Sequence, residues 1–237
     1  MSTNNLPKKS KQETPVRAPS SKDEITDFLR NARAANPVGA GRLIFALDAT
    51  MSRQPTWDMA CEIQASMFKT AGKSGGLSVQ LVYFRGFGEC KASKWVMSGS
   101  ALADIMTGIE CRGGRTQISK VLSHAYKESD KHGIAALVYV GDAMEEDADK
   151  LCHLAGKLGV KGTKTFMFQE GRDAITEGTF REIARLTAGA YMRLNPNSPH
   201  ELEELLSAVA TYAKGGRSAL AALKNNNSQI LLGQIGK

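Results

Sequence analysis

The predicted fold depends most on one stretch, Arg42-Leu-Ile-Phe-Ala-Leu-Asp48-Ala-Thr50-Met-Ser52. The apolar run after Arg42 is short and continuous, which is typical of a strand buried on both faces of a parallel sheet. It ends abruptly in an acid, and two hydroxyl residues follow at alternate positions. The stretch therefore predicts a central strand that carries polar side chains to one end of a sheet.

The rest of the chain repeats the alternation of apolar strand and amphipathic helix. Further strands are expected at 79–84, 134–140, 165–168 and, as an edge strand, 190–194. Helical stripes of apolar residues lie within 118–126, 151–158, 180–187 and 202–213. Residues 90–97 are expected to return antiparallel to 79–84, before a helix at 100–106. The pattern predicts a doubly wound α/β fold with a mostly parallel, six-stranded sheet, one antiparallel edge strand and helices on both faces.

The ends of the chain differ in composition from its centre. Residues 1–22 are basic, rich in proline and poor in apolar residues, so we expect a disordered tail. The domain is expected over 23–213, beginning with a helix whose apolar stripe spans 25–32, and a basic tail over 214–237. The apolar stretch 230–235 allows three interpretations: a strand or helix docked on the body, a partner-binding peptide, or a frayed end.

Charge and cysteine usage exclude several classes of protein. Nine of the 31 basic residues lie in the two tails, and the remainder holds 22 basic and 23 acidic residues, so the core does not demand a nucleic-acid-binding face. Cys61, Cys90, Cys111 and Cys152 match neither a zinc spacing nor a disulfide framework. No apolar run reaches about 18 residues, and the N-terminus has no apolar signal region. We expect a soluble cytoplasmic protein with free thiols, and nucleic-acid contact only weakly through the tails.

Polar residues gather where the parallel strands end. Ligands of open parallel sheets bind at the carboxyl ends of the strands. Five oxygen-bearing side chains fall at such ends: Asp48, Thr50, Ser52, Thr116 and Asp142. Hydroxyl and carboxylate oxygens suit a hard divalent cation, Mg²⁺ or Mn²⁺. With only two carboxylates, such an ion keeps surplus positive charge and an open position for an outside anion.

The order of these residues resembles a known motif. Asp48-x-Thr50-x-Ser52, then Thr116 after a Gly-Gly turn, then Asp142 at the end of an apolar strand, resembles the metal-ion-dependent adhesion site (MIDAS) of von Willebrand factor type A (VWA) domains. The resemblance covers 40–213 and implies a Rossmann-like sheet with one antiparallel edge strand. It also implies a bound Mg²⁺, with an acid of a protein partner completing its coordination. The usual motif is Asp-x-Ser-Gly-Ser, so Thr50 keeps the oxygen, whereas Met51 replaces a flexible glycine.

Other interpretations of the same residues stay open. The acids and hydroxyls could merely cap helices and turns without a metal. The stretch around Asp48, with the acidic run 141–147, also resembles a magnesium-dependent phosphatase of the haloacid dehalogenase type, with Asp48 as nucleophile. That family needs a second aspartate where this chain has Thr50, which cannot act as a general acid near pH 7. Lys120 and Lys131 stay open as partners for a phosphoryl group, and a structural subunit that assembles through its tails is a third class.

Two further residues are candidates for the rim of the site. Arg115 could reach a carboxylate bound at the ion or could point to solvent. Trp57 could shape the rim, or could start a buried helical stripe with Cys61. The sequence thus predicts a non-catalytic, cation-dependent interaction module that recruits a protein partner. Proteins similar to it often act beside ATPases or in multi-protein assemblies.

Overall fold

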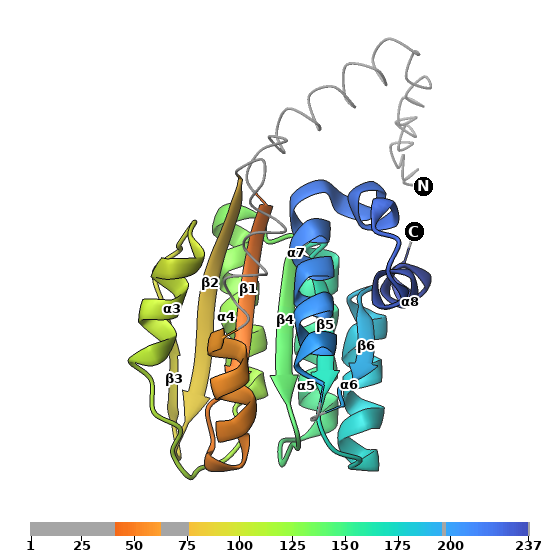
Figure 1. The fold of residues 1–237 in the computed structure, drawn as a ribbon. Coiled ribbons are helices and arrows are strands. Elements are labelled where there is room, and N and C mark those ends of the chain that lie inside the picture. The colour runs from red at the N-terminus through yellow and green to blue at the C-terminus, as the bar shows by residue number, and fades with distance from the viewer. Residues whose placement is uncertain (1–40, 63–75, 196–197, 237) are drawn as a thin grey trace, which may run out of the picture. The chain divides into compact units, whose positions relative to one another are not determined.

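The computed structural model describes residues 41–62, 76–195 and 198–236. The expected N-terminal tail at 1–22 and the helical stripe at 25–32 lie outside these residues. Among the described ranges the elements alternate as predicted, from a central strand outward to both edges of one sheet (Figure 1).

The sheet has six strands in the order β3-β2-β1-β4-β5-β6. Their bounds are β1 Gly41–Asp48, β2 Leu77–Arg85, β3 Glu89–Ala92, β4 Ala136–Gly141, β5 Lys164–Gln169 and β6 Ala190–Arg193. All neighbours are parallel except β3, which pairs antiparallel with β2. The predicted doubly wound fold with one antiparallel edge strand is therefore confirmed.

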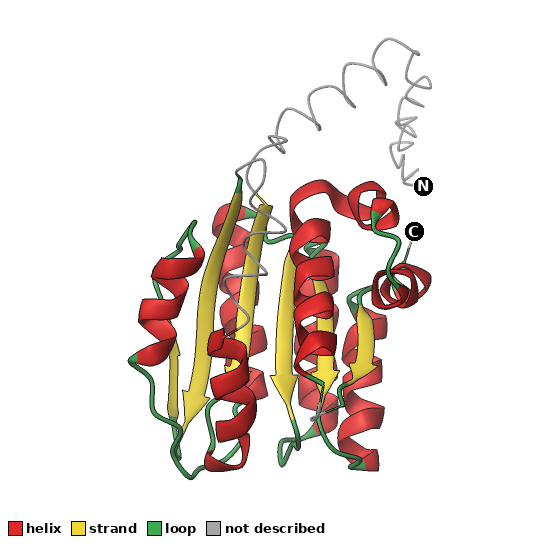
Figure 2. Ribbon diagram, viewed as in Figure 1, coloured by secondary structure: helices red, strands yellow, loops and turns green. Residues whose placement is uncertain are grey.

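Helices cover both faces of the sheet (Figure 2). Their bounds are α3 Gly99–Thr107, α4 Ile118–His132, α5 Ala148–Val160, α6 Ala174–Leu186, α7 Pro199–Ala222 and α8 Asn226–Gln234. Alternate residues of β1 serve the two cores: Phe45 packs with α3 and α7, whereas Ile44 packs with α4, α5 and α6. This double burial explains why the strand sequence is continuously apolar instead of alternating. None of the helices in the described ranges has the length and apolar character needed to cross a membrane.

Strand β3 is shorter than its sequence suggests. The chain was expected to pair with its neighbour over 90–97, but the ladder ends at Ala92 and resumes only as a single bridge between Val79 and Val96. Ser93 explains the break, because its hydroxyl accepts from the backbone N–H of Leu81 at 3.0 Å and donates to the carbonyl of Lys94 at 2.7 Å. The side chain thus takes a backbone donor that a regular ladder would use.

The C-terminal residues pack on the sheet as a helix. Helix α7 continues past residue 213, with a kink at Gly216, whose φ is +66°. Beyond it α8 lies against β6, and Leu231 and Ile235 are buried. The Gln234 side-chain oxygen accepts from the backbone N–H of Tyr191 on β6 at 2.9 Å. Of the three interpretations of 230–235, the structure shows the docked helix, and the exposed edge of the sheet is partly closed by it.

Candidate metal-binding site

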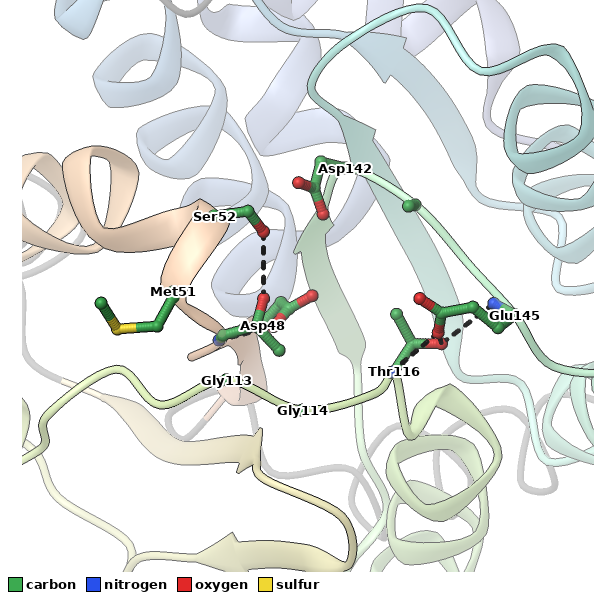
Figure 3. A pocket seen from close by; sticks show the side chains of 10 residues that line it. Asp48, Met51, Ser52, Gly113, Gly114, Thr116, Asp142 and Glu145 are labelled. Carbon is green, nitrogen blue, oxygen red and sulfur yellow. Dashed lines mark hydrogen bonds between the residues drawn. The ribbon is translucent and has the colours of Figure 1, made fainter.

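The strand register brings the predicted ligands to one end of the sheet. Leu47 of β1 is paired with Val140 of β4, so the residues that follow both strands emerge side by side. There they line a pocket of about 210 Å³ together with the Gly113-Gly114 turn that precedes α4. All five predicted ligands line this pocket: Asp48, Thr50, Ser52, Thr116 and Asp142 (Figure 3).

Asp48 is the buried acid of the pocket, with 2% of its surface exposed. Its Oδ1 accepts from the backbone N–H of Thr50 at 2.8 Å. Its Oδ2 is buried and has no hydrogen-bond partner among the described residues. Burial raises the pKa of Asp48 from 3.8 to about 6, although the bonds from Thr50 and the charge of Arg53 oppose this. A buried carboxylate oxygen without a donor is costly unless a cation meets it.

The two hydroxyls after β1 lie close together. Thr50 Oγ1 and Ser52 Oγ are 3.2 Å apart, and Thr50 is buried whereas Ser52 is exposed. The short helix Met51–Arg53 holds this geometry. Arg53 is buried and forms an ion pair with Glu170, which also accepts from the hydroxyl of Thr56. This network connects the residues that follow β1 to the residue that follows β5. The sequence analysis did not identify it.

Glu145 lines the pocket beside Thr116, and the sequence analysis did not identify it as a residue of the site. Its Oε2 accepts from Thr116 twice, from the hydroxyl at 2.7 Å and from the backbone N–H at 3.0 Å. The backbone N–H of Glu145 donates in turn to Thr116 Oγ1 at 3.2 Å. Figure 3 shows the two side chains pointing toward one another at the edge of the pocket. Its position three residues after Asp142, in the same loop, was the available signal.

Of the alternatives left open for the two rim candidates, the structure shows burial for Trp57 and exposure for Arg115. Trp57 is buried in the core and packs edge-to-face on Tyr83 with ring centroids 6.4 Å apart, so it does not line the pocket. Arg115 is exposed and is also absent from the lining; its backbone N–H donates to the carbonyl of Gly86. Met51 does line the pocket, and 61% of its surface is exposed.

Close backbone contact fixes the loop that carries Thr116. A Cβ on Gly114 would lie 2.2 Å from the carbonyl oxygen of Gly86, so only glycine fits there. The contact joins the Gly-Gly turn to the β2–β3 turn. It explains why a glycine stands at position 114, whereas a Cβ at Gly113 would meet no neighbouring atom.

The residues fit a hard divalent cation. Every side-chain donor among the five is an oxygen, and the orphaned Oδ2 of Asp48 is a buried atom that a cation would satisfy. No cluster of three or more His, Cys, Asp or Glu side chains suited to a metal occurs in the described ranges. Binding would therefore depend on the hydroxyls of Thr50, Ser52 and Thr116 as well as on carboxylates.

The sequence matches no protein-family model and no curated protein, but solved structures share its fold. A von Willebrand factor type A structure from Catenulispora acidiphila has a TM-score of 0.60 and 15% identity, covering 75% of this chain and 43% of that one. The VWA domain of SpRpn10 gives 0.54 and 11%, covering 74% and 98%.

Proximal thread matrix protein 1 from the mussel byssus, with a zinc-occupied MIDAS motif, gives a TM-score of 0.57 and 19% identity, covering 74% of this chain and 48% of that one. This chain thus spans less than half of the Catenulispora and mussel chains and nearly all of the SpRpn10 domain. At such identities the likeness concerns architecture. The chain has the fold of the von Willebrand factor type A domains.

Proposed function

We propose that this chain is a divalent-cation-dependent protein-interaction module. Asp48, Thr50, Ser52, Thr116 and Asp142 would hold Mg²⁺ or Mn²⁺, and an Asp or Glu of a partner protein would complete the coordination. The observation that carries the proposal is the buried Oδ2 of Asp48, which has no hydrogen-bond donor in the described structure and lies in an all-oxygen pocket. When bound, the cation would supply the positive charge that attracts an outside carboxylate.

The comparisons support the binding of a divalent cation, but they do not indicate which one. The mussel protein carries zinc at the motif that this pocket resembles, so a divalent ion is favoured. The hard oxygen donors of this chain favour Mg²⁺ or Mn²⁺ over zinc, which more often takes nitrogen and sulfur ligands. We place the module in the cytoplasm, beside an ATPase or within a multi-protein assembly, with no catalytic step of its own.

Affinity capture from lysate tests the proposal. The wild-type chain should recover a set of proteins in 1 mM Mn²⁺ that is lost in EDTA and returns when Mn²⁺ is restored, on the order of a tenfold change in yield. Asp48→Asn should recover none of this set under any condition. Asp104→Asn, an exposed acid on α3, is the matched control and should behave as wild type. Recovery of the same proteins in EDTA and by Asp48→Asn would show that the ion does not recruit them.

Glu145 is expected to strengthen cation binding through Thr116. Because the Thr116 hydroxyl donates its proton to Glu145 Oε2, a lone pair of Oγ1 stays available to a cation in the pocket. Carboxylates that orient a ligand in this way typically contribute 10- to 100-fold in affinity. Glu145→Ala should therefore weaken Mn²⁺ binding, measured by calorimetry, by about tenfold or more.

A conservative variant separates orientation from charge. Glu145→Gln keeps an acceptor for the Thr116 hydroxyl and removes only the negative charge, so its loss should be smaller than that of Glu145→Ala. Glu110→Gln, an exposed acid outside the pocket, should leave the affinity unchanged. Tighter Mn²⁺ binding by Glu145→Ala would mean that Glu145 competes with the cation for Thr116.

A further inference from the structure

A second polar pocket, larger than the first, lies over helices α4 and α5. It measures about 370 Å³ and is lined by Ser119, Lys120, Ser123, His124 and Lys127 of α4 and by Lys150 of α5. It shares no lining residue with the candidate cation pocket, and no carboxylate lines it. In a core whose charges otherwise balance, this local excess of ammonium groups is unusual.

Neighbouring acids do not neutralise the lysines of this pocket. Lys131 and Lys161, elsewhere on the same helices or just beyond them, form ion pairs with Glu128 and Asp130. In contrast, Lys127 and Lys150 form no ion pair within the described part of the chain.

Lys120 is held in place by neutral acceptors. Its Nζ donates to the carbonyl of Gly88 and to the side-chain oxygen of Gln117, each at 2.8 Å. Its charge therefore stays uncompensated while its position is fixed, which lowers the entropy cost of meeting an anion.

The remaining titratable groups near the pocket are a histidine and several acids whose oxygens are engaged elsewhere. His124 shares a hydrogen bond with the side-chain oxygen of Gln80 at 2.8 Å, and burial lowers the pKa of its ring, which favours the neutral imidazole. Three acids lie close by and keep their charge, but their oxygens have other partners: Glu128 is paired with Lys131, and the other two lie at helix starts. Glu146 accepts from the first backbone N–H groups of α4, and Asp147 accepts from the backbone N–H of Lys150.

The spacing of the lysines selects the kind of anion. Lys120 and Lys127 are seven residues apart on one helix, about 10 Å along its axis, so the two lysines are spread along the pocket instead of gathered at one point. A chain of phosphates can contact both. No Phe, Tyr or Trp side chain lines the pocket, and the one aromatic ring there, the imidazole of His124, is hydrogen-bonded to Gln80, so the pocket lacks the row of rings on which successive bases of a single-stranded nucleic acid stack. The volume suits a small ligand.

We propose that this pocket binds a linear oligophosphate, with Lys120, Lys127 and Lys150 contacting successive phosphates and the Ser119 and Ser123 hydroxyls donating to phosphate oxygens. The same chemistry occurs in free polyphosphate and in the phosphate tail of a nucleotide. The site is independent of the cation proposed above, so it is tested in EDTA, where failure of the cation site has no effect.

Calorimetry with tripolyphosphate in EDTA at low salt tests this site. Wild type and Asp48→Asn should bind equally, and Lys127→Gln/Lys150→Gln should bind at least tenfold more weakly. Lys91→Gln/Lys94→Gln removes the same charge from β3 and the residues after it, and should stay within twofold of wild type. Circular dichroism melts confirm that each variant folds. Absence of wild-type binding, or equal losses in the two double variants, would overturn the proposal.

Parallel titrations distinguish the source of the phosphates. ATP should bind as tightly as tripolyphosphate, and adenosine should not bind, because the proposed contacts are all made to the phosphates. A single-stranded oligonucleotide that bound more tightly than tripolyphosphate, or adenosine binding on its own, would contradict an oligophosphate site.

Discussion

Asp48→Asn is expected to stabilise the protein in cation-free buffer at pH 8, by about 2 kcal/mol. The ionised carboxylate of Asp48 is buried with one oxygen unpaired, and its pKa is raised to about 6. Since each tenfold difference in proton affinity corresponds to about 1.4 kcal/mol, ionisation costs the fold on the order of 3 kcal/mol. Asparagine keeps the acceptor for the Thr50 N–H, but its side-chain NH₂ group is left without a partner. This unpaired group costs about 1 kcal/mol and reduces the expected stabilisation by that amount.

The effect has a defined pH dependence. The folded protein holds the Asp48 proton more tightly than the unfolded chain does. The contribution of Asp48 to the free energy of unfolding of the wild type therefore falls as the pH rises from 3.8 through about 6. The advantage of Asp48→Asn should therefore vanish near pH 4 and reach its full size above pH 7. Urea unfolding at pH 4, 6 and 8, with Asp104→Asn as the control, measures it.

Addition of Mn²⁺ should reverse the order of the two proteins. A cation at 100 times its Kd stabilises the folded state by about 2.7 kcal/mol, and only wild type should gain it. Equal stabilisation of Asp48→Asn by Mn²⁺ would remove Asp48 from the ligand set. If Asp48→Asn were less stable than the wild type at pH 8 without cation, other groups of the protein would already balance the charge of the buried carboxylate.

Leu231→Ala is expected to lower the free energy of unfolding by about 3 kcal/mol. Leu231 of α8 is fully buried, and truncating a leucine in a packed core removes both its transfer free energy and its contacts. The adjacent Ile230 is 39% exposed, so Ile230→Ala is a matched control and should change stability by less than about 1 kcal/mol. Equal effects of the two substitutions would mean that α8 is not packed as described.

Removing residues 224–237 should have a larger effect. The deletion uncovers the backbone N–H of Tyr191 and the outer edge of β6, which α8 and Gln234 now cover. Uncovered edges pair with other strands, so the truncated chain should self-associate in size-exclusion chromatography with light scattering. The same measurement addresses assembly through the tail: an intact chain that forms oligomers lost on truncation would favour that third class.

The strands and the pocket were predictable because each rests on a local pattern. The continuous apolar run before Asp48 marks a central strand, and parallel strands place Asp48 and Asp142 at the same end whatever their separation in sequence. Thr50 and Met51 differ from the usual Asp-x-Ser-Gly-Ser motif, yet both residues line the pocket.

The missed residues act through contacts that no local pattern encodes. Glu145 acts through a hydroxyl 29 residues earlier, and Arg53 through an acid 117 residues later. The early end of β3 depends on one serine hydroxyl, and the contact of α8 with the edge of β6 includes one glutamine side chain. Spacing and periodicity report which face a residue occupies, but not which distant side chain it meets there.

The close approach of Gly114 to Gly86 couples the turn before Thr116 to the β2–β3 turn, so the two loops are expected to move together. The tip of the β2–β3 hairpin, where Phe87 stands 85% exposed, cannot shift without carrying the turn before Thr116 with it. An insertion or label placed at that tip would therefore act as a perturbation of the pocket, although it lies about thirty positions earlier in the chain. Engineers who need a neutral attachment point on this domain should choose the far end of the sheet.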